Sequence, residues 1–454
     1  MLALNKCLKL TAGLLWLSTS IFGAHVAAAG NPTIVYPTGL FPVDVQNVQT
    51  AISLGGTVLL KSTDIAGRPL AFNFGPPDRS VGSGVNLTTD VTIRGERVGG
   101  RMTTINGGYF PILGRLPVKS RIEGIDFESP LSAAILLVES KGTAIVGNRI
   151  NAVVGVRVRF GTDGDGIDLF GNSDPQNAIT GHVLIANNII ENLSADFSNG
   201  MQLDDVAADV DIKGNIVRFA QSNGPVQTIG ITAFRSHNRV SIVGNDVSMG
   251  PVSLDAFPAA IFVGGDLDAR YLVALNTVVV NHPNGDGIAL SGYFVPIQNA
   301  VIVGNRITID SSFADHVGSD YFGLAGVDAF GAVSNSLIAA NRISGTSAFA
   351  IDVAGAGELA DSDRLIENDL SRFTSLTTDI YFDAFTNNML FIGRCKSDID
   401  QGVNNQISCD AAGGGRTAAA ALTRGTGFRA HLRDVSRLDT RGAILEATQE
   451  RMTR

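Results

Sequence analysis

The chain has 454 residues, of which 44% are hydrophobic and only 17% are charged, with a formal net charge of −9 and a mean hydropathy of +0.20. This composition excludes an intrinsically disordered chain and a basic nucleic-acid-binding protein. Glycine is abundant, at 52 residues, whereas aromatic residues make up 7%. We therefore expect a core of small and branched side chains, with tight turns between short elements.

The first 29 residues are typical of a secretory signal peptide. Lys6 and Lys9 precede an apolar run from Leu10 to Phe22, and Ala27 to Ala29 supply the small residues that precede a cleavage site. The run is shorter than the roughly 20 residues that span a bilayer, so cleavage is favoured over a retained membrane anchor. The prediction is a mature chain without a membrane span, located in the periplasm or outside the cell.

Removal of this leader leaves Cys395 and Cys409 as the only cysteines, 14 positions apart. An even pair of cysteines in an oxidising compartment predicts one disulfide. Metal ligation or redox chemistry is the alternative, but neither a CxxC spacing nor nearby histidines accompany the pair. The disulfide would close a short loop where the repeats end.

A six-residue phrase, apolar-x-small-Asn-x-apolar, recurs eight times through the middle of the chain. Its asparagines are Asn148, Asn187, Asn215, Asn245, Asn276, Asn305, Asn341 and Asn368. A second phrase, small-apolar-x-apolar, lies between the copies, as in GIDL at Gly166 and GITA at Gly230. Both phrases alternate with a period of two, which predicts short strands and excludes helical repeats. A step of about 30 residues predicts one coil of a solenoid whose parallel strands stack about 4.8 Å apart.

The asparagines are expected to form a structural ladder along the solenoid. Asn tolerates left-handed backbone dihedrals, and its amide can hydrogen-bond to the coil above or below. The Ile and Val residues three positions before and two positions after each Asn are expected to point inward and form the core.

The segments before and after the repeats differ from them in composition and spacing. Val45–Leu54 has apolar residues at helical spacing and predicts a helix that covers the open end of the first coil. Residues 411–454 are an Ala/Gly-rich linker followed by an arginine-rich stretch, which we interpret as a helical, flexible tail, with a binding arm as the alternative. The predicted organisation is a signal peptide at 1–29, a β-helix domain at 30–410 and this tail.

The phrase AISLGGTVLLKST from Ala51, VTIRG from Val91 and the serial IVGNRI-type copies resemble the right-handed parallel β-helix repeats of the pectate-lyase-like superfamily. The resemblance covers about Val45 to Cys409 and implies an all-β, single-stranded right-handed parallel β-helix with a polysaccharide partner. The superfamily includes polysaccharide lyases, polygalacturonase-type hydrolases, mannuronan epimerases and proteins with no known catalysis. A shared fold does not choose among these, so a non-catalytic binding or structural solenoid of the cell envelope is the alternative.

Candidate site residues come from the outward positions of the second phrase. Residues next to the first apolar position form one outward row: Asp168, Gln202, Thr232, Phe262, Ala289, Asp328, Asp352 and Tyr381. Past the same strands come Asp204, Asp205, Arg235 and His237. In a hydrolase, Asp168 with Asp204 or Asp205 would act as acid and base. In a lyase or epimerase, Arg235 would neutralise a uronate and His237 would abstract or donate the proton.

The segment before the row adds further candidates. Asp163 and Asp165 are candidate Ca²⁺ ligands or caps of backbone amides in a tight turn. Arg157 and Arg159 alternate with apolar residues, so they would either hold an acidic saccharide or form a solvated edge.

The acidic phrases are similar to motifs of polygalacturonases, but only in part. GTDGDGID is similar to their Asn-Thr-Asp motif and the run from Leu203 to Asp205 to their Gly-Asp-Asp motif, yet Gly161 replaces the Asn and no Gly-His-Gly or Arg-Ile-Lys follows. These departures disfavour the hydrolase. No nucleic-acid, nucleotide, haem or zinc ligand is expected, and we expect a monomer.

Overall fold

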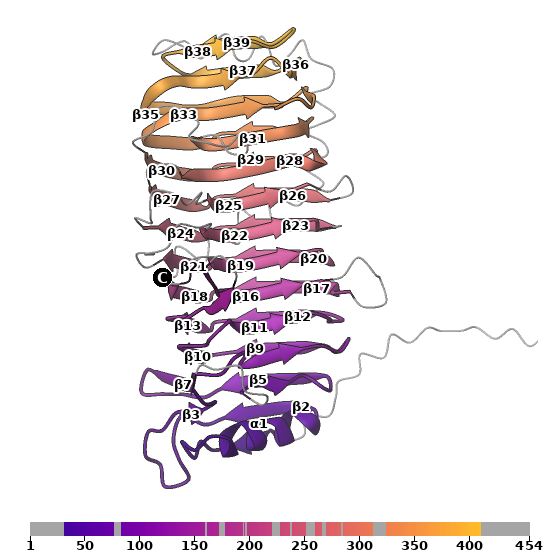
Figure 1. Ribbon diagram of the computed structural model, residues 1–454, viewed down its shortest axis with the longest axis vertical. Helices are drawn as coiled ribbons and strands as arrows, with labels where there is room; N and C mark the ends of the chain where they lie inside the picture. Colours follow the sequence, from indigo (N-terminus) through magenta and orange to yellow (C-terminus); the bar gives the residue numbers. More distant parts are fainter. Residues whose placement is uncertain are drawn as a thin grey trace, which may run out of the picture.

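The computed structural model describes the chain from residue 31 to residue 409 with several gaps; the described residues are 31–76, 83–158, 161–171, 178–193, 195, 198–219, 228–236, 238–250, 259–265, 269–282, 285–311 and 324–409. They form the predicted right-handed parallel β-helix, in which coils stack along one axis from α1 at one end to β39 at the other (Figure 1). The predicted signal peptide and tail lie outside the described residues.

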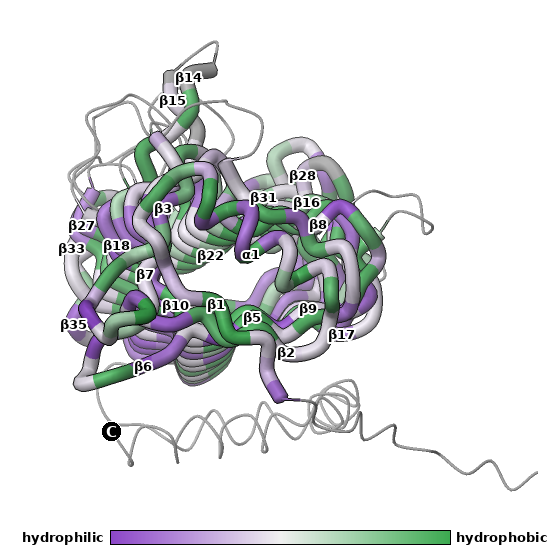
Figure 2. Tube along the Cα trace, turned by 90° about the horizontal axis from the view of Figure 1, so that it is seen from below, coloured by the Kyte–Doolittle hydropathy of each residue, from purple (hydrophilic) through white to green (hydrophobic). Residues whose placement is uncertain are grey.

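Each complete coil contributes a strand to each of three parallel sheets, which we call faces 1, 2 and 3 (Figure 2). Face 1 contains the first part of β35 (Arg364–Phe382) and β1 (Thr33–Val35), β2 (Gly56–Leu60), β5 (Val91–Gly95), β9 (Ser120–Glu123), β12 (Thr143–Val146), β17 (Thr180–Ala186), β20 (Ala207–Lys213), β23 (Arg239–Val243), β26 (Arg270–Ala274), β29 (Val301–Val303), β32 (Leu337–Ala339), β37 (Leu390–Arg394) and β39 (Gln406–Cys409).

Face 2 contains the first part of β33 (Arg342–Ala354), the middle of β35, and β3 (Phe72–Asn73), β7 (Arg101–Asn106), β10 (Ile125–Glu128), β13 (Arg149–Asn151), β18 (Ile189–Leu193), β21 (Ile216–Phe219), β24 (Asp246–Met249), β27 (Thr277–Asn281) and β30 (Arg306–Asp310). Face 3 contains the ends of β33 and β35, and β4 (Val85–Asn86), β8 (Ile112–Gly114), β11 (Ala133–Leu137), β16 (Asp165–Phe170), β19 (Ser198–Asp204), β22 (Thr228–Phe234), β25 (Ala259–Gly264), β28 (Asp286–Gln298), β31 (Ala325–Ser334) and β38 (Asp398–Asp400).

Five shorter strands lie outside these ladders or at their corners. β6 (Arg97–Val98) pairs antiparallel with β7, and β14 (Val156–Val158) pairs antiparallel with β15 (Gly161–Asp163) in a hairpin that projects from the stack (Figure 2). β34 (Ala360–Asp361) and β36 (Thr386–Asn387) pair with each other at a corner near the C-terminal end.

The register of face 3 agrees with the alignment of the second phrase. Ile167 pairs with Met201, Met201 with Ile231 and Ile231 with Ile261, and the ladder continues to Ile380. All of these side chains are buried in one continuous core, together with the Ile and Val residues that flank the asparagines. Burying each such side chain contributes roughly 1.5–3 kcal/mol.

The asparagine ladder is present, but one member differs from the sequence prediction. Asn188 and not Asn187 occupies the ladder, because Ile185 pairs with Ile145 and Ile190 with Ile150. Two adjacent asparagines between apolar residues made both registers plausible in the sequence. The ladder side chains from Asn148 to Asn341 are held in the same way: the Nδ2 group of Asn245, for example, donates to Asn276 Oδ1 and to the Ile212 carbonyl oxygen, both at 3.0 Å.

The left-handed backbone conformation belongs to the residue before each ladder asparagine, so its assignment to the ladder residue was wrong. Gly244 has φ 67° ahead of Asn245, and Asn187 has φ 54° ahead of Asn188. Glycine and asparagine are favoured there because they adopt positive φ at little cost. The ladder asparagine is then selected by its buried hydrogen bonds.

The predicted N-terminal helix and the predicted disulfide are both present. Helix α1 (Val43–Ser53) lies across the first coil and buries Val45, Val48 and Ile52. Cys395 and Cys409 form a disulfide with a Cα–Cα distance of 5.1 Å, which ties β39 to the end of β37. Within the described part of the chain, no helix combines the length and apolarity needed to cross a bilayer.

Candidate functional site

Two rows of outward-facing side chains run along face 3. They arise because, in each strand, the small residue of the second phrase and the apolar residue after it both face the core. In β16, Gly166 and Ile167 both face the core, so Asp165 and Asp168 both face outward. A Cβ at Gly200, the next equivalent, would lie 2.5 Å from the Gly230 carbonyl oxygen and 2.4 Å from Val217. This close approach between coils explains the small residue in the second phrase and fixes the direction of the acids beside it.

Asp165 is buried and belongs to a hydrogen-bond network across three coils. Its Oδ1 accepts hydrogen bonds from the Asn199 backbone N–H at 2.7 Å and from Asn199 Nδ2 at 3.0 Å. Asn199 Nδ2 also donates to Gln202 Oε1 at 2.7 Å, and Thr232 Oγ1 donates to Asn199 Oδ1 at 3.0 Å. The network locks the outward polar groups of β16, β19 and β22 into one orientation.

Asp204 and Arg235 form an ion pair at the end of these strands. Arg235 Nη2 donates to both carboxylate oxygens of Asp204, at 2.9 and 3.0 Å, and Nε donates to Oδ1 at 3.1 Å. The guanidinium also lies 5.1 Å from the centre of the Phe234 ring, a cation–π distance. Burial raises the pKa of Asp204, an effect that Asp205 reinforces and Arg235 opposes.

An exposed aromatic side chain borders this ion pair. Phe170 pairs in register with Asp204 and is 46% exposed. Asp168, half-buried, lies two residues before it, and its register neighbour in the next coil is Gln202. Adjacent coils therefore present an acid, an amide, an ion pair and an apolar ring on one side of the solenoid.

The other predicted residues are placed only in part. Asp205 follows Asp204 with φ 58°, and its backbone N–H donates to the Phe234 carbonyl oxygen at 3.0 Å. The backbones of Arg157 and Asp163 lie in the β14–β15 hairpin, but their side chains are outside the described part of the structure, as are His237 and Arg159. The roles assigned to these four residues stay predictions.

A second group of acids on face 3 was not assigned a role from the sequence. Asp286, Asp328 and Asp352 are 2%, 1% and 0% exposed, although they occupy outward rows. Asp328 pairs in register with Asp352, and the Oδ1 of Asp286 accepts a hydrogen bond from the Ala325 backbone N–H at 3.0 Å. Burial raises the pKa values of Asp286 and Asp352 well above the usual range, and Asp328 raises both further.

One sequence signal could have identified this second group. The phrase Gly-Asp-Gly-Ile occurs at residues 164–167 and again at 285–288, so Asp286 is the equivalent of Asp165. Both carboxyl groups accept the backbone N–H of the next coil.

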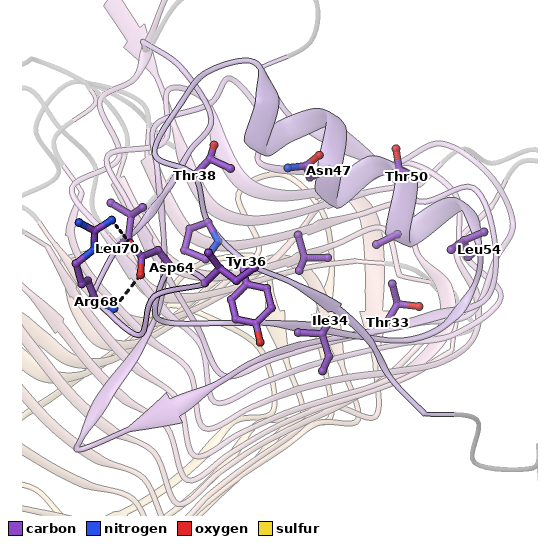
Figure 3. Close-up of a pocket in the computed structure, with 14 residues that line it drawn as sticks. Thr33, Ile34, Tyr36, Thr38, Asn47, Thr50, Leu54, Asp64, Arg68 and Leu70 are labelled. Carbon is purple, nitrogen blue, oxygen red and sulfur yellow. Dashed lines mark hydrogen bonds and ion pairs between the residues drawn. The ribbon is translucent and has the colours of Figure 1, made fainter.

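A separate concavity lies at the N-terminal end, between α1 and β1 (Figure 3). It has a volume of about 660 Å³, and its lining includes Ile34, Tyr36 and Leu54. The ion pair between Arg68 and Asp64, 2.7 Å apart, closes one side. This pocket shares no residue with the acids of face 3.

A metal ion was predicted only near Asp163 and Asp165. Among the side chains that the structure describes, no three from His, Cys, Asp and Glu lie close enough together to share a metal. The Asp165 carboxylate is engaged by Asn199, and the Asp163 side chain is not among those described. Calcium binding therefore stays a prediction.

The fold is the right-handed parallel β-helix that the repeats predicted, and face 3 carries polar and charged side chains over β16, β19 and β22. No protein-family model and no curated protein sequence matches the chain.

The solved structures that are similar to it include two modules of enzymes from Azotobacter vinelandii. The A-module of mannuronan C-5 epimerase AlgE4 is 14% identical with a TM-score of 0.45, and the match covers 82% of this chain and 98% of that one. The A-module of mannuronan C-5 epimerase AlgE6 is 13% identical with a TM-score of 0.38, covering 85% and 98%. Similarity at this level says nothing about activity.

Proposed function

We propose that the protein is exported and binds a uronate-containing polysaccharide along face 3, over β16, β19 and β22, and that it acts on this glycan. The observation that carries the proposal is the alignment of Asp168, Gln202, the Asp204–Arg235 ion pair and exposed Phe170 on adjacent coils. Carboxylate, amide and guanidinium groups hydrogen-bond to sugar hydroxyl and carboxylate groups. An exposed phenyl ring packs against the apolar face of a pyranose.

Arg235 is the group best suited to bind a uronate carboxylate. Guanidinium groups bind carboxylates in a bidentate manner, as Arg235 already does with Asp204. A uronate that takes over this contact releases Asp204. The released carboxyl keeps the burial that raises its pKa and loses the cation that lowers it. Substrate binding would thus prepare Asp204 to carry a proton.

Two reactions can use this arrangement. In a lyase or epimerase, Arg235 neutralises the uronate carboxylate and a base, for which His237 is the candidate, removes the neighbouring proton. In a hydrolase, Asp168 with Asp204 or Asp205 supplies the acid and the base. Asp163 and Asp165 would serve Ca²⁺ binding in the first case.

A non-catalytic binding solenoid is the second candidate. The observation in its favour is that the polar side chains of the outward row give way to apolar ones after β22. Phe262 and Ala289 are apolar and buried and belong to a small hydrophobic cluster with Ile229 and Ala259. A binding module needs only the three coils before this cluster.

The test incubates the protein with uronate and neutral polysaccharides, with and without Ca²⁺, and measures affinity, unsaturated products by ultraviolet absorbance, and reducing ends. Unsaturated products identify a lyase, and reducing ends without them a hydrolase. NMR of the same samples detects epimerisation. Binding without any product identifies the non-catalytic module, and no binding to any glycan contradicts the proposal.

Matched variants locate the site. Arg235→Ala is expected to weaken uronate binding about tenfold, as loss of a charge-assisted contact does. Arg239→Ala is the control, because Arg239 lies four residues away and pairs with Asp211 at 2.9 Å on face 1. Equal losses in both variants would place the binding site elsewhere.

A further inference from the structure

The C-terminal half of face 1 carries an apolar strip on its outward side. The strip consists of Val243, Leu272, Ala274, Val301, Leu337 and Ile366. These residues alternate with Ile242, Val273, Ile302, Ile338 and Leu365, which belong to the core inside the solenoid. The strip is a separate cluster on the opposite side of the same strands.

The N-terminal half of face 1 carries charged residues among the equivalent positions, although Val146, Leu184 and Ala186 there are apolar. Lys213 pairs in register with Val243, and Asp211 lies in the row that leads through Ser241 to Leu272. Further toward the N-terminus, Arg94 and Glu123 form an ion pair across adjacent coils, 2.7 Å apart. The outward side of this half is therefore more polar than that of the C-terminal half.

The apolar half is covered. Its six members are only 1–7% exposed, although they point away from the core. The hydrophobic side chains that pack with them, Leu275, Val303 and Ala339, come from the same face. These neighbours lie beside the strip and not over it, so another segment must shield it from water.

We propose that the C-terminal segment, residues 411–454, lies along this strip and covers it within the same molecule. The first argument is the place where the described chain ends. Cys409 ends β39, the last strand of face 1, and the disulfide to Cys395 anchors it there. From β39 back to β23 there are six strand spacings, about 29 Å. A helix of about 20 residues spans this length.

The second argument is the pattern of the segment. Phe428, Leu432, Val435 and Leu438 follow one another at i, i+4, i+7 and i+10, which places them on one face of a helix. Arg429, Arg433, Arg437 and Arg441 fall on the opposite face. Such a helix can pack its apolar face on the strip and leave its arginines in solvent.

The third argument is charge. Residues 30–409 contain 24 basic and 38 acidic residues, whereas residues 410–454 contain eight arginines and five acids. The segment is basic and the solenoid is acidic, so the field of the whole domain favours their association.

The test measures how fast a cysteine in the strip reacts with a thiol reagent in the full chain. Val301→Cys is made in a Cys7→Ser background, so that the native disulfide holds the only other cysteines. Its tail variant carries Leu432→Asp and Val435→Asp, which remove the apolar face of the segment. The labelling rate is expected to rise at least about tenfold in the tail variant, because protection against a probe reports the opening of the cover.

The control variant carries Arg433→Lys and Arg437→Lys on the polar face, which keep the charge of the segment, and should leave the rate within about twofold. Slow labelling that persists in the tail variant would overturn the proposal, since some other segment would then cover the strip. Protection that disappears on dilution would also overturn it, because the cover would come from a second copy of the chain.

Discussion

The two acidic stretches of face 3 occupy the same positions of the repeat and differ in their surroundings. Asp165 and Asp286 are equivalent, and Asp168 lies in the same outward row as Asp328 and Asp352. In the first stretch Asp168 is half-buried, and Asp204 nearby pairs with Arg235. In the second stretch, Asp286, Asp328 and Asp352 are almost completely buried.

The direction of an acidic side chain and its protonation state therefore have different causes. Position in the repeat decides the direction of a side chain, because the stacking of coils fixes the register. What lies over the face decides its chemistry, since burial and neighbouring carboxyl groups favour the protonated form of an acid. An outward acid in a solenoid is therefore a site candidate only where the face above it is open.

The largest expected effect is on stability at high pH in the second stretch. Because burial and Asp328 raise the pKa of Asp352 in the folded state, the folded protein holds a proton that the unfolded chain loses at about pH 4. The free energy of unfolding must then fall as the pH rises from about 4 to the folded-state pKa. Asp352→Asn removes the part of this decline that Asp352 causes and is expected to stabilise the protein by about 1–3 kcal/mol at pH 8, measured by urea denaturation across pH.

Asp369 provides a control of opposite sign. It is half-buried, and hydrogen bonds from Ser371 lower its pKa, so it supports the folded state above the unfolded-state pKa and loses this contribution in acid. Asp369→Asn should therefore leave the decline between pH 4 and pH 8 unchanged. If Asp352→Asn also leaves it unchanged, Asp352 is not the source.

An effect of comparable size is expected at the equivalent hydrogen bonds of Asp165 and Asp286 in the two stretches. Asp165→Ala removes the acceptor of the Asn199 backbone N–H and should cost about 1–3 kcal/mol, whereas Asp165→Asn keeps an oxygen there and should cost less. Asp286→Asn also keeps the acceptor and removes a carboxyl whose pKa is raised by burial and by Asp328, so it should stabilise the protein at pH 8.

Unfolding in urea at pH 8 distinguishes these cases. Equal losses for Asp165→Ala and Asp165→Asn would show that the hydrogen bond is unimportant. Destabilisation by Asp286→Asn would contradict the sign derived from its pKa.

The repeat made most of the fold predictable from the sequence. The alignment of Ile167 with Ile380 through six intermediate coils holds residue by residue, because inward apolar positions and small bulge residues leave one register. The exception is Asn187, where a neighbouring asparagine and apolar residues at both spacings allowed a slip of one.

The openness of the site was not predictable in the same way. Asp168 and Asp352 look alike in the outward row, yet only one is half-exposed. Exposure depends on segments that connect the strands and vary in length from coil to coil, and these carry no repeat. The pairing of Asp204 with Arg235 likewise required two coils to be placed side by side.

The smallest expected effect on stability is at the ion pair that we place in the glycan site. The Arg235 side chain is 46% exposed and that of Asp204 is 13% exposed, so solvent screens part of their attraction, and the burial that raises the pKa of Asp204 offsets part of the rest. Asp204→Asn should therefore change the free energy of unfolding by less than about 1 kcal/mol, measured in urea at pH 7. Its effect on turnover should be far larger if Asp204 carries a proton in the reaction, about 100-fold or more. A loss of activity matched by a comparable loss of stability would instead mark Asp204 as a structural residue, like Asp165, and the open stretch of face 3 would be a binding surface alone.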